Sequence, residues 1–214
     1  MTAMRNRPFP FLASLSTIPA MPCLVQREAA LSLRTARDFV RPRVSWPVDA
    51  QDGNPIAVFL WDGDSCFDAA DALCSEGGVI VLALQTAALD VATIALEWAG
   101  DHAGLLGADP DQLLLAGGGL AAAAALHARD EGWPPLSRQL LIGPDLSGWP
   151  PATASLAGVA PATVVNAQGY ASRLRHAGVE VAELSPEDPL RFDWVRGLRS
   201  DDVDPDNPRP VFRR

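Results

Sequence analysis

The sequence predicts an α/β fold, a mostly parallel sheet of about six strands with helices on both faces. Two continuous apolar runs, IAVFLW (residues 56–61) and VIVLAL (residues 79–84), are typical of strands that are buried on both faces. Helical segments of 8–18 residues separate such runs along the chain. Strands that alternate with helices in this way form βαβ units, and βαβ units build parallel sheets.

The expected elements follow one another regularly from residue 56 onward. Strands are expected at residues 56–61, 78–84, 112–116, 139–143, 162–167 and 179–184. Helices are expected at residues 67–74, 89–106, 120–131 and 170–177. Before residue 49 the apolar residues show no strong periodicity, and we expect only a short amphipathic helix over residues 27–40. We therefore divide the chain into an irregular or cap-like segment (1–48), a core (49–198) and an acidic, proline-rich tail (199–214) that is predicted to be disordered.

Composition narrows the classes of function. The 214 residues suffice for one domain, and the net charge of −9 argues against nucleic acid and anionic membranes as partners. The longest apolar run, residues 113–126, is shorter than the roughly 20 residues of a membrane span. The early prolines make a poor signal peptide, so we expect a cytoplasmic protein. Arginine without lysine suggests a GC-rich, bacterial coding bias.

Cysteine and histidine usage predicts no metal centre. Three cysteines, Cys23, Cys66 and Cys74, occur without CxxC spacing, which disfavours a disulfide framework or a zinc site. We interpret them as small buried hydrophobic residues, and Cys66 as a nucleophile would need a base that the sequence does not place beside it. We expect no metal and no other cofactor.

Three long sequence segments resemble those of the hormone-sensitive-lipase-like branch of the α/β-hydrolases, which are also called the α/β-hydrolase fold-3 carboxylesterases. They are LEWAGDHAGLLGADPDQLLLAG (96–117), LAAAAALHARDEGWPPLSRQLLIGPDL (120–146) and APATVVNAQGYASRLRHAGVEVAEL (160–184). They occur in the order of the family, and the resemblance covers about residues 55–194. It implies an α/β-hydrolase core and ester hydrolysis by a serine, a histidine and an acid.

Two motifs of the family are altered at the strand ends. The nucleophile elbow, G-D-S-A-G-G in the family, is reduced to Gly117, Gly118 and Gly119, so the attacking serine is missing. The oxyanion motif H-G-G-G corresponds to WDGD (61–64), where two carboxylates would repel the negative charge that develops during hydrolysis.

The other two catalytic groups are missing as well. The chain passes from the strand at 162–167 straight into the next helix, without the loop that carries the acid in the family. The stretch after the last strand, SPEDPLRFD (185–193), contains no histidine. The three histidines that exist, His102, His127 and His176, match ordinary surface positions on helices. We therefore assign no catalytic residue. The first two strands of the family, which are antiparallel, are reduced in this reading to residues 39–48.

The candidate ligand-binding residues lie where two predicted strands end. In open α/β sheets, ligands bind at the carboxyl ends of the strands. The candidates share that edge: Trp61, Asp62, Gly63, Asp64, Ser65, Gly117, Gly118 and Gly119. The glycines could bind an anion through backbone N–H groups, but a shortened, closely packed turn is the commoner explanation for such a run. The paired carboxylates could act in acid–base chemistry or hold a cation, although solvated loop acids are commoner.

Three functions are compatible with this pattern. The leading one is a catalytically degenerate esterase-like protein that binds a small apolar molecule or a protein partner. The alternatives are a non-hydrolytic enzyme (a cyclase, lyase or isomerase) using Asp62, Asp64 or Glu187, and a residual hydrolase with a recruited nucleophile such as Ser65. If the first strands were missing, the open sheet edge could also dock another chain and form an oligomer.

Overall fold

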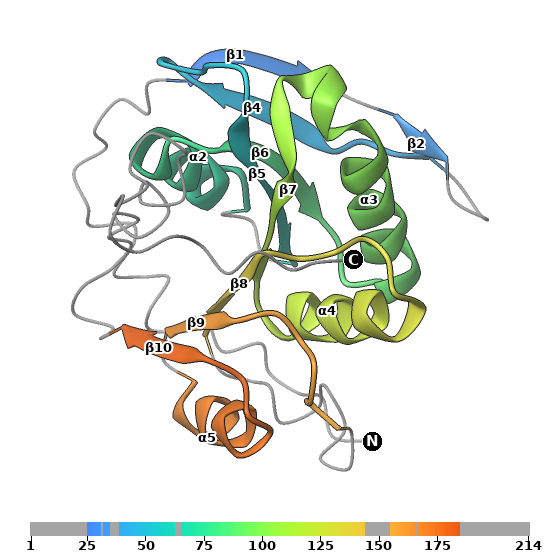
Figure 1. Ribbon diagram of the computed structural model, residues 1–214. Helices are drawn as coiled ribbons and strands as arrows, with labels where there is room; N and C mark the ends of the chain where they lie inside the picture. The colour runs from blue at the N-terminus through green and yellow to red at the C-terminus, as the bar shows by residue number, and fades with distance from the viewer. Residues whose placement is uncertain are drawn as a thin grey trace, which may run out of the picture.

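The computed structural model describes residues 25–30, 32–34, 39–62, 66–143, 155–165 and 167–184. Its centre is an eight-stranded sheet with the order β1-β4-β6-β5-β7-β8-β9-β10 (Figure 1). The strands are β1 (Val25–Ala30), β4 (Arg43–Pro47), β5 (Asn54–Trp61), β6 (Ile80–Gln85), β7 (Ala108–Gly117), β8 (Arg138–Ile142), β9 (Ala162–Val165) and β10 (Val181–Leu184). A separate two-stranded sheet pairs β2 (Leu33–Arg34) with β3 (Phe39–Val40).

The six strands from β5 onward are parallel, and they are the six strands that the apolar runs predicted. Every β5 residue except the last is buried, as expected for a central strand with neighbours on both sides. Pro55 lies within β5, where the register with β7 shifts between Asn54 and Ile56. Such an irregularity accommodates a residue that has no N–H to donate.

One prediction for the first part of the chain is wrong. A helix was expected over residues 27–40, but the described residues there form β1, β2 and β3. The mostly parallel sheet is confirmed, and β1 and β4 extend its six parallel strands by two antiparallel strands beyond β6. Both lie in the segment 1–48 that was set apart as irregular or cap-like. The first strands are therefore present, and the edge that was expected to be open carries β1.

Helices cover the two faces of the sheet unequally. One face packs against α3 (Leu89–His102), α4 (Gly119–Glu131) and α5 (Gln168–His176), with the short 3₁₀ helix η1 (Ala103–Leu106) after α3. The other face packs against α2 (Cys66–Gly77) (Figure 1). The four helices predicted from residue 67 onward are confirmed, which gives the expected arrangement of helices on both faces.

Candidate functional site

The carboxyl ends of β5 and β7 place the candidate residues side by side. Leu60 of β5 pairs with Gly117 of β7, so the residues that follow them, Trp61 at the end of β5 and Gly118 just before α4, lie next to each other. A Cβ atom placed on Gly118 would lie 3.9 Å from Cζ3 of Trp61. The structure thus brings together Trp61, Gly117 and Gly118, with Gly119 as the first residue of α4.

Gly117 has no room for a side chain. A Cβ atom at this position would lie 2.1 Å from the carbonyl oxygen of Leu60, far inside van der Waals contact. Its φ of +141° is also a conformation that residues with a side chain rarely adopt. The glycine therefore lets β5, β7 and the start of α4 approach closely, and no substitution at 117 could supply a nucleophile without displacing the strand beside it.

Gly118 differs from its neighbour because it has space around it. Its φ is −90°, and a Cβ atom would make ordinary contacts with the carbonyl oxygen of Ile142, at 3.7 Å, and with Trp61. Gly118 is the N-cap of α4, and its carbonyl accepts hydrogen bonds from the N–H groups of Ala121 and Ala122. Ile142, the last residue of β8, was not a sequence candidate, although the end of the neighbouring predicted strand could have indicated it.

Trp61 and Asp62 take different positions at this edge. The Trp61 side chain is half-buried, and its ring stacks on Phe59 at 6.1 Å between centroids. Its backbone carbonyl accepts a hydrogen bond from the N–H of Thr86, which ties the end of β5 to β6. Asp62 is exposed. The remaining candidates, Gly63, Asp64 and Ser65, lie outside the described residues.

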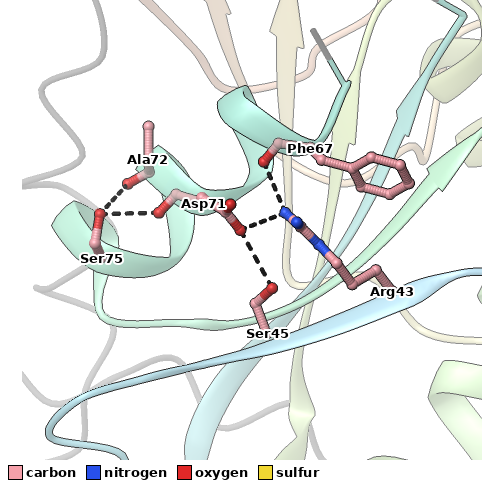
Figure 2. Close-up of polar contacts among 6 residues, drawn as sticks. All are labelled: Arg43, Ser45, Phe67, Asp71, Ala72 and Ser75. Carbon is pink, nitrogen blue, oxygen red and sulfur yellow. Dashed lines mark hydrogen bonds and ion pairs between the residues drawn. The ribbon is translucent and has the colours of Figure 1, made fainter. Parts of the chain in front are cut away.

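A polar cluster fixes α2, the helix that begins just after these candidates (Figure 2). The guanidinium of Arg43 on β4 pairs with the carboxylate of Asp71 and donates a hydrogen bond of 2.9 Å to the carbonyl of Phe67. The buried hydroxyl of Ser45 donates to the same carboxylate at 3.3 Å. Arg43 also lies over the Phe67 ring. This cluster joins an antiparallel strand to the first two turns of α2, and it was not predicted from the sequence.

Cys66 is buried at the first residue of α2. Burial raises the pKa of its thiol to about 11, and the nearby positive charge of Arg43 offsets only part of that rise. A thiol with so high a pKa is almost entirely protonated near neutral pH, and the thiolate is the nucleophilic form. Cys66 therefore has the properties of the small buried hydrophobic residue that the sequence suggested.

The three histidines lie on helices away from this edge. His102 and His176 are the last residues of α3 and α5, and each directs Nδ1 to a backbone carbonyl one turn earlier. Helices that connect parallel strands run back from the carboxyl edge to the amino edge, so their last residues lie at the opposite edge from Trp61. His127 lies beyond the midpoint of α4. None of them can serve as a base at Gly118.

Two cavities formed by described residues lie elsewhere. One, of about 370 Å³, is lined by Trp46, Asp52, Leu106 and other residues near the amino edge of the sheet. The other, of about 560 Å³, lies beside the last turn of α5 and is lined by Leu156, Arg173 and His176 among others. Within the described ranges, no three His, Cys, Asp or Glu side chains gather as metal ligands, and no helix is long and apolar enough to span a membrane.

Comparisons with known proteins connect the chain to esterases. No protein-family model matches it. Carboxylesterase NlhH of Mycobacterium tuberculosis is 33% identical over 122 residues, which cover 48% of this chain and 38% of that protein. Esterase LipI of the same species is 29% identical over 170 residues, covering 69% of this chain and 53% of that protein. The chain thus spans about half, or less, of the length of the curated relatives that it matches.

Solved structures of esterases have the same fold. A bacterial heroin esterase superposes with a TM-score of 0.70 at 18% identity, over 89% of this chain and 90% of that chain. EstE1, a thermostable carboxylesterase cloned from a metagenomic library, superposes with a TM-score of 0.67 at 19% identity, over 75% of this chain and 79% of that chain. From the fold and these comparisons together, the protein has an α/β-hydrolase fold and resembles the hormone-sensitive-lipase-like, α/β-hydrolase fold-3 carboxylesterases.

Proposed function

We propose that this protein is a catalytically degenerate α/β-hydrolase, which keeps the esterase-like fold and acts by binding a small apolar molecule or a protein partner. One observation carries the proposal. The junction between β7 and α4, which holds the nucleophile in esterases of this fold, consists of Gly117, Gly118 and Gly119. Ester hydrolysis by these enzymes begins with attack by a side-chain hydroxyl, and glycine has none.

The surroundings of the junction support the same proposal. A serine hydroxyl is a weak nucleophile until a base within hydrogen-bond reach accepts its proton. The three histidines lie on helix segments away from Gly118, so they cannot accept a proton there. The loss of a complete triad lowers kcat by a factor on the order of 10⁶. What remains at this edge is the half-buried indole of Trp61, a surface suited to apolar or aromatic ligands.

Reaction with a fluorophosphonate tests the absence of a nucleophile directly. Such reagents phosphonylate activated serines, and the product is detected as an increase in intact mass. We expect the mass of the protein to stay unchanged, while an active carboxylesterase in a parallel sample is labelled completely. Stoichiometric labelling would overturn the proposal, and mapping the adduct would identify the recruited residue, with Ser65 examined first.

A second measurement tests the binding function. Short- and medium-chain carboxylic acids and esters serve as probes, and the shift in melting temperature serves as the readout. We expect at least one probe to stabilise the natural chain and to lose this effect in Trp61→Ala, while Trp133→Ala, at a partly exposed tryptophan on another part of the surface, keeps it. Equal shifts in both variants would exclude the edge near Trp61 as the binding site.

Within the residues that the structure describes, nothing favours the alternative of a non-hydrolytic enzyme such as a cyclase, lyase or isomerase. That function would need a carboxylate pointing into an enclosed pocket. Asp62 is exposed and lines neither of the two cavities described above. The other two candidate acids, Asp64 and Glu187, lie outside the described residues.

A further inference from the structure

The cavity of about 370 Å³ lies at the amino edge of the sheet, at the opposite end of β5 from Trp61. Three parts of the fold meet there. Ser45 of β4 pairs with Val81 of β6, so the next pair, Trp46 and Ile80, lies side by side and lines the cavity. The turn between β4 and β5 and the link between η1 and β7 supply the remaining lining residues, which are Ala50, Gln51, Asp52, Leu106 and Gly107.

Apolar side chains form the inner part of this cavity. Trp46 and Ile80 are buried, and the indole N–H of Trp46 donates a hydrogen bond of 2.9 Å to the carbonyl of Leu106, which fixes the ring in place. Two exposed apolar side chains lie close by in sequence, Val48 beside the β4–β5 turn and Leu105, which is 83% exposed, next to Leu106. Ligand cavities are typically lined in this way by apolar and aromatic side chains with a few polar groups.

The turn that carries Asp52 is held in position by hydrogen bonds. The N–H of Gly53 donates to the carbonyl of Gly107 at 2.9 Å, and the buried side chain of Asn54 accepts a hydrogen bond of 3.0 Å from the N–H of Gln51. A Cβ atom on Gly107 would lie 3.4 Å from Oδ1 of Asp52, so the carboxylate lies close to this glycine. Because the Asp52 side chain is exposed, its charge lies at the mouth of the cavity.

The described residues that line the cavity carry a single formal charge, the carboxylate of Asp52. No Arg or His is among them, and Asp52 takes part in none of the ion pairs between described residues. A negative charge at the mouth of an apolar cavity, on a chain with a net charge of −9, attracts cations and repels anions. Hard metal cations need several oxygen ligands, so one carboxylate beside apolar walls suits an organic cation better.

We propose that this cavity binds a small organic ammonium ion, with the ammonium group beside Asp52 and the hydrocarbon part against Trp46 and Ile80. The volume lies near the lower end of the range for ligand cavities, which is about 300–1,000 Å³, so the ligand is expected to be small. The indole and the turn are both held by hydrogen bonds, so little ordering is needed when the ligand binds.

A titration of the full chain with n-butylammonium, n-butanol and butyrate, followed by NMR of backbone amides and indole N–H groups, tests the proposal. The three probes share the length of their chain and differ in charge. We expect butylammonium to bind at least about threefold more tightly than butanol, and butyrate to bind most weakly. The shifts should be largest at the Trp46 indole, Gln51 and Gly107. Equal affinities for butylammonium and butanol, or shifts centred on Trp61, would overturn the proposal.

Removal of the charge should abolish the preference for the cation. Asp52→Asn should weaken the binding of butylammonium at least about threefold, to the affinity of butanol, and should leave butanol unaffected. Asp111→Asn is the matched control, because Asp111 is an exposed acid on β7 that does not line the cavity. We expect this control to bind all three probes as the natural chain does. An equal loss in the two variants would mean a general attraction to the acidic surface and would contradict a site at Asp52.

Filling the cavity provides an independent test. Ala50→Leu should weaken the binding of butylammonium and butanol alike, at least about tenfold, since the larger side chain takes up the space of the hydrocarbon part. Ala157→Leu, in the cavity beside α5, should leave binding unchanged. Undiminished binding to a folded Ala50→Leu variant would exclude this cavity, and Asp52→Asn, at an exposed position, decides the matter if Ala50→Leu does not fold. The binding function proposed for the edge near Trp61 is tested with acids and esters, so either proposal can fail alone.

Discussion

Gly117 and Gly118 are neighbours in the sequence but differ in what the fold requires of them. The Cβ position of Gly117 overlaps the Leu60 carbonyl, whereas the Cβ position of Gly118 makes ordinary contacts. The first glycine therefore serves close packing between β5, β7 and α4. The second leaves space beside Trp61 that a small side chain could fill. A run of glycines in the sequence does not reveal this difference, since it depends on the neighbouring strand.

The two glycines should respond differently to the same substitution. Gly117→Ala should reduce the free energy of unfolding by about 3 kcal/mol, because the added methyl group forces the backbone of β5 or β7 to move and the φ angle is unfavourable. Gly118→Ala should change it by less than about 1 kcal/mol. Urea denaturation measures both values, and equal losses in the two variants would contradict the close approach at Gly117.

The buried thiol of Cys66 should make stability depend on pH in the alkaline range. Its pKa rises from the ordinary 9.0 to about 11 in the folded protein, so the folded state holds the proton more tightly than the unfolded state. The resulting stabilisation is complete below about pH 9 and is lost as the pH rises to about 11. Tyr170, whose pKa burial raises to about 12, contributes in the same direction at higher pH.

A single variant isolates the contribution of the thiol. Between pH 8 and pH 10.5, the free energy of unfolding should fall more steeply in the natural chain than in Cys66→Ala, which keeps Tyr170. Denaturant titrations at the two pH values provide the comparison. Parallel pH profiles would mean that the Cys66 thiol does not have the raised pKa described above.

At the scale of elements, the Arg43 cluster links the antiparallel strand β4 to α2 (Figure 2). Asp71→Ala would leave the half-buried guanidinium of Arg43 without its carboxylate and should destabilise the protein by about 2 kcal/mol. The control is Glu183→Ala, which removes an exposed pair with Arg175 and should cost less than about 1 kcal/mol. Thermal unfolding compares the two, and a larger loss in Glu183→Ala would contradict the anchoring role of Asp71.

Elements also differ in how well the sequence predicts them. The strands from β5 onward were predictable because both of their faces are buried, which produces continuous apolar runs such as IAVFLW. β1 (VQREAA) was missed because its charged and polar residues give no such run, a feature typical of edge strands. In β4 (RVSWP), Arg43 and Ser45 face α2 while Val44 and Trp46 face the other core, and five residues are too few for that alternation to stand out.

At the scale of the whole molecule, the fold was predictable and the site only in part. The order of the family-like sequence segments and the alternation of strands with helices indicated the α/β-hydrolase fold. The position of Trp61 beside the glycines could be predicted because parallel strands end at the same edge of the sheet. The roles of Gly117 and Arg43 were not predictable, since each depends on contact with a strand or helix distant in sequence. The eight strands also show that the sheet retains its antiparallel end.

Turnover of a short-chain p-nitrophenyl ester by the purified chain is the most direct test of the central claim, that the β7–α4 junction contains no nucleophile. We expect no hydrolysis above a buffer blank, both for the natural chain and for Gly118→Ser, because a serine at this position would still have no histidine within reach. Turnover that exceeds the blank and disappears when a residue at the carboxyl edge is substituted would contradict this expectation and identify a recruited catalytic group.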